Sequence, residues 1–209
     1  MAKEALKRKR NAEATRGELL DAATEVFAET GYHGARVDDI ATRARVNKRM
    51  IYAYFGDKEG LYRSVLASYF ERISELASAN EAAESDPWAA TEAVIREYFE
   101  VLAEHPRFAR LLVWELLSGV GHFLIESATP GLGALRGILR SGVSRGVFRS
   151  DLDDRKTVMS VNALCLGFFL QRATLGAVWR RDLTTPQALE EIVDHTLRFV
   201  SDGISRRKS

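Results

Sequence analysis

The chain has 209 residues, of which 46% are apolar, so it can bury a real core and is too long for a lone DNA-binding module. Its formal net charge is only +1, but residues 1–63 carry 13 Lys and Arg against 10 Asp and Glu, whereas residues 64–209 carry 17 against 19. One cysteine, Cys165, excludes an intramolecular disulfide and a multi-cysteine zinc site.

Helical periodicity recurs along the whole sequence, and no alternating strand pattern is visible. We therefore predict an all-α fold of about nine helices. Residues 1–11 are rich in Lys and Arg, which predicts a basic, flexible N-terminal arm that strengthens DNA binding without reading its sequence. A first helix is expected over 12–30, ended by Gly31, a residue that takes a left-handed conformation at little cost.

The stretch 37–56 predicts two short helices joined by a tight turn. Ile40 and Ala41 face inward in the first of them, and Ile51 does so in the second. Asn47 precedes the second helix and can accept its free backbone N–H groups. This arrangement predicts a helix-turn-helix, with residues 12–57 as the DNA-binding domain. An ordinary helical hairpin with solvated charges is the alternative.

The outward face of the second short helix carries side chains suited to a DNA groove. Arg49 can donate two hydrogen bonds to a guanine edge, and Lys48 is a more flexible donor. Met50 and Ala53 can touch a thymine methyl group, while tyrosines can donate to phosphate. The predicted DNA-binding residues are Arg36, Asn47, Lys48, Arg49, Met50, Tyr52, Ala53, Tyr54 and Lys58.

Over about residues 14–66 the chain resembles the TetR family of transcriptional regulators. The matching residues are Phe27 with Gly31-Tyr32, Ile40-Ala41, Ala44-Arg45-Val46-Asn47, Ile51-Tyr52-Ala53-Tyr54-Phe55 and Lys58-Glu59-Gly60-Leu61. The resemblance implies that Lys48, Arg49 and Met50 meet bases. It also implies that Tyr52, Tyr54 and Lys58 meet phosphates. The C-terminal part resembles the family's regulatory domain only in its length and number of helices.

Two positions depart from the family pattern. Arg36 replaces the usual Ser or Thr before the second helix, so a hydroxyl cap is lost and a guanidinium that can hold a phosphate is gained. Arg45 replaces the usual turn glycine. A left-handed conformation at Arg45 would cost about 1 kcal/mol.

Residues 58–209 predict a helical regulatory and dimerisation domain. Its expected helices cover 57–79, 86–104, a stretch after Pro106, 132–145, 154–179 and 186–202, and the glycine-rich stretch 119–133 is expected to be a loop followed by a helix start. Asp86-Pro87 and Thr185-Pro186 each pair a capping residue with a proline suited to the first helical position.

The last two helices are more apolar than one small domain can cover, which favours a homodimer formed through both of them. A fully intramolecular core is the alternative. The longest apolar run, 158–170, is shorter than the roughly 20 residues that a membrane span needs. The basic N-terminus is not followed by an apolar signal core, so we expect a cytoplasmic protein without a membrane partner.

Polar and aromatic residues on otherwise apolar helices are the candidates for an effector pocket. They are Phe99, Phe108, Trp114, Glu115, His122, Asn162, Cys165, Phe169 and Arg172. Glu115 and Asn162 stand out because a buried polar group needs a partner. This set of residues suggests a small, largely apolar effector that is uncharged or cationic.

No catalytic motif, metal site or cofactor site is visible, since the four histidines are scattered and no nucleophile elbow is present. We therefore predict a sequence-specific regulator that is not an enzyme. In this interpretation, a ligand-responsive repressor binds a palindromic operator in double-stranded DNA as a homodimer. The alternatives are a helical enzyme or carrier with a vestigial helix-turn-helix, and a ligand-independent regulator that acts through a protein partner.

Overall fold

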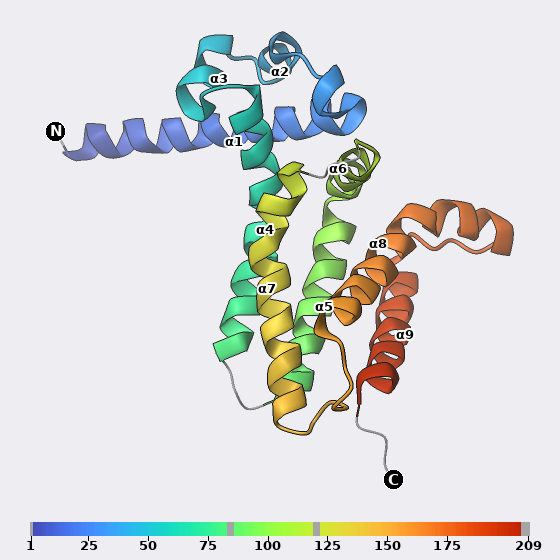
Figure 1. The fold of residues 1–209 in the computed structure, drawn as a ribbon. Coiled ribbons are helices and arrows are strands. Elements are labelled where there is room, and N and C mark those ends of the chain that lie inside the picture. Colours follow the sequence, from blue (N-terminus) through green and yellow to red (C-terminus); the bar gives the residue numbers. More distant parts are fainter. Residues whose placement is uncertain (1, 83–85, 119–121, 206–209) are drawn as a thin grey trace. The chain divides into compact units, whose positions relative to one another are not determined.

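The computed structural model describes residues 2–82, 86–118 and 122–205. This part of the chain is all-α, as predicted (Figure 1). Its nine helices are α1 (Ala2–Gly34), α2 (Val37–Arg43), α3 (Lys48–Phe55), α4 (Lys58–Ala82), α5 (Pro87–Glu104), α6 (Pro106–Leu117), α7 (His122–Ser144), α8 (Asp154–Trp179) and α9 (Pro186–Ile204). An isolated antiparallel bridge joins Phe148 to Ser205.

The helices form two compact units. The first unit comprises Met1–Tyr69 with Arg110–Ser127, and the second comprises Phe70–Ala109 with Ala128–Ser209. Helices α4, α6 and α7 therefore contribute to both units. The predicted domain boundary after residue 57 falls at the start of α4, whereas the two units divide within this 25-residue helix, after Tyr69.

In the first unit, α1 contributes the largest part of the core. Leu19, Ala23 and Phe27 are fully buried along one face of α1, where Tyr62 of α4 meets the Phe27 ring edge-on at 4.7 Å between centroids. Gly31 has φ 69° and ψ 175°, so the backbone leaves helical geometry where the sequence predicted the end of the first helix.

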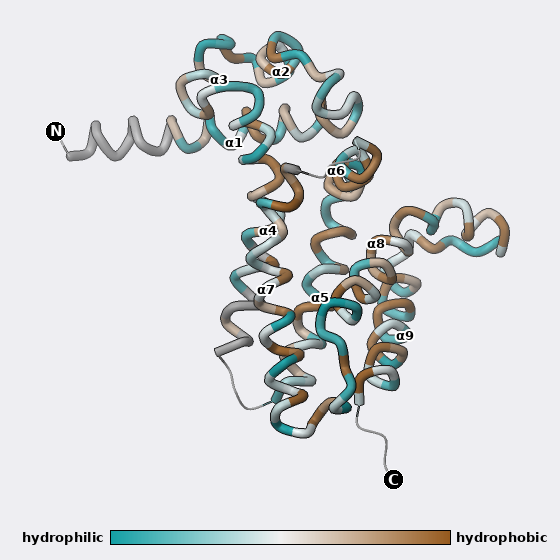
Figure 2. The backbone as a smooth tube through the Cα atoms, in the orientation of Figure 1, coloured by the Kyte–Doolittle hydropathy of each residue, from teal (hydrophilic) through white to brown (hydrophobic). Residues whose placement is uncertain are grey.

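In the second unit, α5 packs against both α8 and α9. Three local caps set where these helices begin. The Asp86 carboxylate accepts hydrogen bonds from the backbone N–H groups of Trp88 and Ala89 at the start of α5. The Asp153 carboxylate and the Thr185 hydroxyl likewise accept hydrogen bonds from backbone N–H groups in the first turns of α8 and α9. Figure 2 shows hydrophobic residues recurring along α8 and α9.

Two predicted helix starts were wrong. Helix α1 begins at Ala2 rather than at residue 12, so residues 2–11, predicted as a flexible arm, are helical; their Ala, Leu, Lys and Arg residues have high helix propensity. Helix α7 begins at His122 and includes Pro130, where a loop was expected. Gly131 explains this difference, because a Cβ atom there would lie 3.1 Å from Ser74 Oγ. The glycine therefore permits α7 to approach α4 closely and does not mark a loop.

Candidate nucleic-acid interface and effector cavity

The two short helices α2 and α3 are held as a helix-turn-helix by their buried faces. Ile40, Ala41 and Ile51 are buried, and the Asn47 side chain caps α3 by accepting from the Arg49 amide at 2.9 Å. The turn between the helices places Arg45 in the left-handed region, with φ 56°. The opposite face of α3 is therefore fixed in an outward orientation.

Most of the predicted base-reading residues lie on that outward face. Lys48, Arg49 and Ala53 are exposed, Tyr52 is half exposed, and Met50 is partly buried. The Lys48 ammonium lies 3.0 Å from a carboxylate oxygen of Asp38 on α2, and this hydrogen bond raises the pKa of the lysine. Both side chains are exposed, so a phosphate can compete with the ion pair.

The other predicted contacts lie around α3 in the sequence: Arg36 precedes α2, Tyr54 is on α3 and Lys58 begins α4. Arg36 is exposed at the N-terminal end of α2, and among the described residues its side chain makes no capping hydrogen bond. Tyr54 is partly buried beside Phe55, with ring centroids 6.2 Å apart.

The Lys58 ammonium is engaged with the end of α1. It donates to the carbonyl oxygens of Tyr32 and Ala35 at 2.9 and 3.1 Å, and it lies 4.5 Å from the centroid of the Tyr32 ring. Lys58 therefore ties the start of α4 to the segment that leads into α2. A phosphate contact by its remaining N–H group stays a prediction.

Two cations that connect the helices around α3 were not predicted. The Arg43 guanidinium on α2 lies 2.7 Å from Glu29 and 3.5 Å from Glu25, both on α1. The hydrogen bond to Glu29 raises the pKa of Arg43. Arg16 lies over the Phe55 ring at 5.2 Å. The pairs are distant in sequence, and only the i, i+4 spacing of the two glutamates hinted at a shared cation.

The residues predicted for an effector pocket do not form one group. Phe99, Asn162, Cys165, Phe169 and Arg172 lie on α5 and α8 in the second unit. There Asn162 accepts from the Tyr98 hydroxyl at 2.9 Å, and Arg172 lies over the Phe169 ring.

The other predicted pocket residues lie elsewhere in the fold. Phe108, also in the second unit, packs edge-on against Phe70. Trp114 and Glu115 belong to the first unit. The His122 side chain lies outside the described residues.

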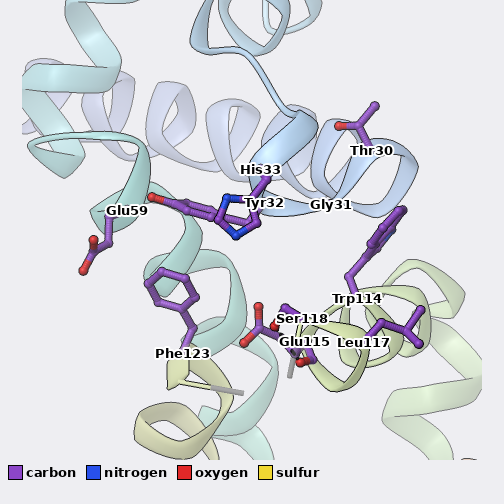
Figure 3. A pocket seen from close by; sticks show the side chains of 10 residues that line it. All are labelled: Thr30, Gly31, Tyr32, His33, Glu59, Trp114, Glu115, Leu117, Ser118 and Phe123. Carbon is purple, nitrogen blue, oxygen red and sulfur yellow. Dashed lines mark hydrogen bonds between the residues drawn. The ribbon is translucent and has the colours of Figure 1, made fainter. Parts of the chain in front are cut away.

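Trp114 and Glu115 line a cavity of about 500 Å³ in the first unit. Its other walls come from the end of α1, the first turn of α4 and the first turn of α7, including Tyr32, His33 and Phe123 (Figure 3). Sequence reasoning missed these last three residues, because nothing local connects them with α6.

Two hydrogen bonds position α6 at this cavity. The Trp114 indole donates to the carbonyl oxygen of Ala28 on α1 at 3.2 Å, and the Tyr62 hydroxyl donates to Glu115 Oε1 at 2.8 Å. Burial, together with the neighbouring Glu115, raises the pKa of Tyr62 well above its usual range. Glu115 itself is only 3% exposed.

A capped, outward-facing recognition helix joined to a larger helical part defines a DNA-binding transcriptional regulator. Two family models match this chain, one described as "Bacterial regulatory proteins, tetR family" over residues 19–65 and the other as "Tetracyclin repressor-like, C-terminal domain" over residues 87–200. The chain belongs to the TetR family of bacterial transcriptional regulators. It is thus a DNA-binding transcriptional regulator.

Individual relatives agree with this assignment. The chain is 31% identical over 200 residues to the transcriptional repressor NicS of Pseudomonas putida, covering 93% of this chain and 92% of that protein. It is 28% identical over 205 residues to the transcriptional regulator RutR of Escherichia coli, covering 96% and 95%. The crystal structure of FadR from Bacillus subtilis in complex with stearoyl-CoA superposes with a TM-score of 0.73 over 90% of this chain and 98% of that one. At 24% identity, that likeness shows the fold alone.

Proposed function

We propose that the protein is a cytoplasmic repressor that binds a palindromic operator as a homodimer and releases it when a small effector binds. The observation that carries this proposal is the exposed face of α3, held rigid by the Asn47 cap and by the buried Ile51. In such a dimer the two recognition helices read half-sites in successive major grooves. Repression follows when the occupied operator blocks access of the polymerase to a promoter.

Arg49 is the proposed base-reading residue, and Tyr52 the proposed phosphate donor beside it. We expect Arg49→Ala to weaken binding to DNA selected from a random pool by about 10- to 100-fold, corresponding to about 1–3 kcal/mol, and to relax the preference at one base pair. Arg155→Ala is the matched control, since Arg155 is equally exposed at the start of α8 in the second unit. Equal DNA affinity of the two variants would contradict the assignment.

Residues 1–11 contribute sequence-independent affinity in this proposal, since Lys7, Arg8, Lys9 and Arg10 add positive charge just before the DNA-binding domain in the sequence. Removing residues 1–10 is expected to weaken binding to all DNA sequences alike and to flatten the dependence on salt. Loss of affinity for the selected sequence only would argue against this role.

The proposed dimer forms through α8 and α9. Met159, Leu164, Leu170 and Val178 are exposed on α8, and at about 100° per residue they lie within one sector of the helix of about 140°. Phe199 of α9 is also exposed, at 62%. An apolar face of this kind on a soluble monomer would favour association.

Charge at this face should separate the protomers. We expect Phe199→Glu to shift the protein from dimer to monomer in sedimentation measurements at micromolar concentration. Leu132→Glu is the control, because Leu132 is an exposed leucine on α7. A monomeric wild-type protein, or a Phe199→Glu variant that remains a dimer, would refute the proposed interface.

Helix α8 also meets the length and apolarity of a membrane-spanning helix, and 22% of its most apolar window is buried. The proposed dimer accounts for this exposed surface, because a second copy of α8 covers it. Asp154 and Arg155 lie at its N-terminal end, and the helix is packed against α5 and α9 on its other side. The apolar sector is therefore assigned to protein association.

The proposed effector acts by preferring one arrangement of the dimer. A ligand that binds the non-DNA-binding arrangement 100-fold more tightly shifts the equilibrium by about 2.7 kcal/mol, which is sufficient for regulation. FadR of Bacillus subtilis was crystallised with stearoyl-CoA. For the present chain we propose a small, apolar or cationic effector, because the polar residues on its apolar helices include an anionic one, Glu115.

A further inference from the structure

The cavity in the first unit contains a buried carboxylate with an unsatisfied oxygen. Glu115 is 97% buried, and its Oε1 accepts from the Tyr62 hydroxyl at 2.8 Å. Its Oε2 is buried and has no hydrogen-bond partner among the residues that the structure describes. Burying a carboxylate oxygen without a partner costs free energy, unless a hydrogen-bond donor or a cation binds to that oxygen.

The nearby cations of the same unit are engaged elsewhere. Lys58 donates to two backbone carbonyls of the α1–α2 connection. Arg63 pairs with Glu59, which also lines the cavity, and with Glu126. Lys58 is thus occupied by carbonyl oxygens and Arg63 by two other carboxylates, so neither of these cations pairs with Glu115.

The cavity walls suit a cation with an apolar body. Tyr32 and Phe123 line the cavity with ring centroids 4.9 Å apart, and the Trp114 side chain lines another part of it (Figure 3). Lys58 and Arg63 already lie over the Tyr32 and Phe123 rings, at 4.5 and 5.2 Å from the centroids. Aromatic rings around a buried carboxylate attract ammonium and amidinium groups, and a volume of about 500 Å³ accommodates a small organic molecule.

We propose that this cavity binds a small organic cation, an amine or amidine with an aromatic or alkyl body, whose N–H group donates to Glu115 Oε2. This inference rests on the proposed function, in which a small effector releases the DNA: the bound cation is that effector. The cavity is lined by Gly31 and Tyr32 at the end of α1, and Lys58 at the start of α4 binds the carbonyl oxygens of Tyr32 and of Ala35, which leads into α2. A ligand that displaces these residues moves the recognition helices.

Binding is tested without DNA, using phenethylammonium as the probe and the uncharged 2-phenylethanol as its isostere. Calorimetry or protein-observed NMR should show the ammonium binding at least about tenfold more tightly than the alcohol. Glu115→Gln should abolish this difference. Equal affinity of the two probes for the wild-type protein, or an unchanged preference in Glu115→Gln, would overturn the proposed site.

A second variant keeps the test valid if Glu115→Gln does not fold. Ser118→Arg adds a cation at an exposed position on the rim of the cavity and should weaken phenethylammonium binding by about tenfold. Ser150→Arg adds the same charge at an exposed position of the second unit and should leave binding unchanged. Equal binding by the two arginine variants would place the probe outside the cavity and overturn the proposal.

Coupling to DNA is tested separately on sequences selected from a random pool. Phenethylammonium should weaken binding to the selected DNA, and Glu115→Gln should bind the same DNA without responding to the probe. Binding of the probe with no change in DNA affinity would overturn its role as effector. Failure to select any DNA would instead refute the proposed function, while the calorimetric result for the cavity would still stand on its own.

Discussion

Lys58 offers a test of whether a cation beside the recognition helix stabilises the fold or contacts DNA. Lys58→Met keeps most of the apolar stem and removes two charge-assisted hydrogen bonds, at 2.9 and 3.1 Å, together with the ammonium 4.5 Å from the Tyr32 ring centroid. Hydrogen bonds to charged groups contribute about 1.5–3 kcal/mol, and a partly exposed cation–π contact about 0.5–1 kcal/mol. Because water can replace part of this at a half-buried position, we expect the free energy of unfolding to fall by about 2 kcal/mol, which lowers the Tm by about 4–8 °C.

The assay combines denaturant unfolding with a salt titration of DNA binding. A lysine that neutralises a phosphate contributes about 0.9 to the slope of log K against log salt concentration, whereas a structural lysine contributes nothing. We expect Lys58→Met to lose stability and to lower the slope by less than about 0.9, because two of its three N–H groups already donate to carbonyl oxygens. Lys48→Met, at the exposed pair with Asp38, should keep its Tm unchanged and lower the slope. Unchanged stability with a lowered slope in Lys58→Met would refute the reasoning.

Four further residues each give a test of their own. Arg45→Gly relieves a left-handed strain of about 1–2 kcal/mol. The glycine also makes the unfolded chain more flexible, which lowers stability by about 0.5–1 kcal/mol. The Tm should therefore rise by about 1–3 °C. Arg180→Gly, at φ 53°, should behave alike in the same thermal scan, and a lower Tm in either variant would contradict the strain. Gly31→Ala should destabilise the protein by more than about 1 kcal/mol in denaturant unfolding, because φ is 69° and the new Cβ lies 2.9 Å from the Trp114 ring. Burial raises the pKa of Cys165 to about 12, so at pH 8 its thiol stays protonated and should react with iodoacetamide far more slowly in the native protein than in denaturant; equal rates would contradict its burial.

Helix ends with local chemical signals were predictable from the sequence. Gly31 ends the regular part of α1, Asn47 caps α3, and Gly56 follows it with φ 81°. Asp86 and Thr185 cap α5 and α9 as expected from their following prolines. Each of these signals involves groups within a few residues of one another, so sequence spacing alone determines the geometry.

Features that depend on long-range packing were not predictable. The cluster of glycine and proline around Gly131 predicts a loop followed by a helix start, yet Gly131 lies within α7 with its backbone against Ser74 of α4. The attachment of α6 within the first unit was not predictable either, because it depends on the Trp114 indole reaching the Ala28 carbonyl and on the Tyr62 hydroxyl reaching Glu115. Which face of α7 or α6 meets which neighbour is decided by the packing of several helices at once.

Glu115 shows where the boundary between these two kinds of feature lies. Its place on an otherwise apolar helix was enough to predict that burial would require a partner, since the physical cost attaches to the residue itself. The partner could not be found in the same way, because Tyr62 lies 53 residues earlier and is one of several tyrosines with an available hydroxyl. The hydroxyl satisfies only one carboxylate oxygen within the described residues, so the structure converts a general requirement into a specific one: a donor is needed at Oε2. That requirement, rather than the family resemblance, determines the chemistry expected of the effector.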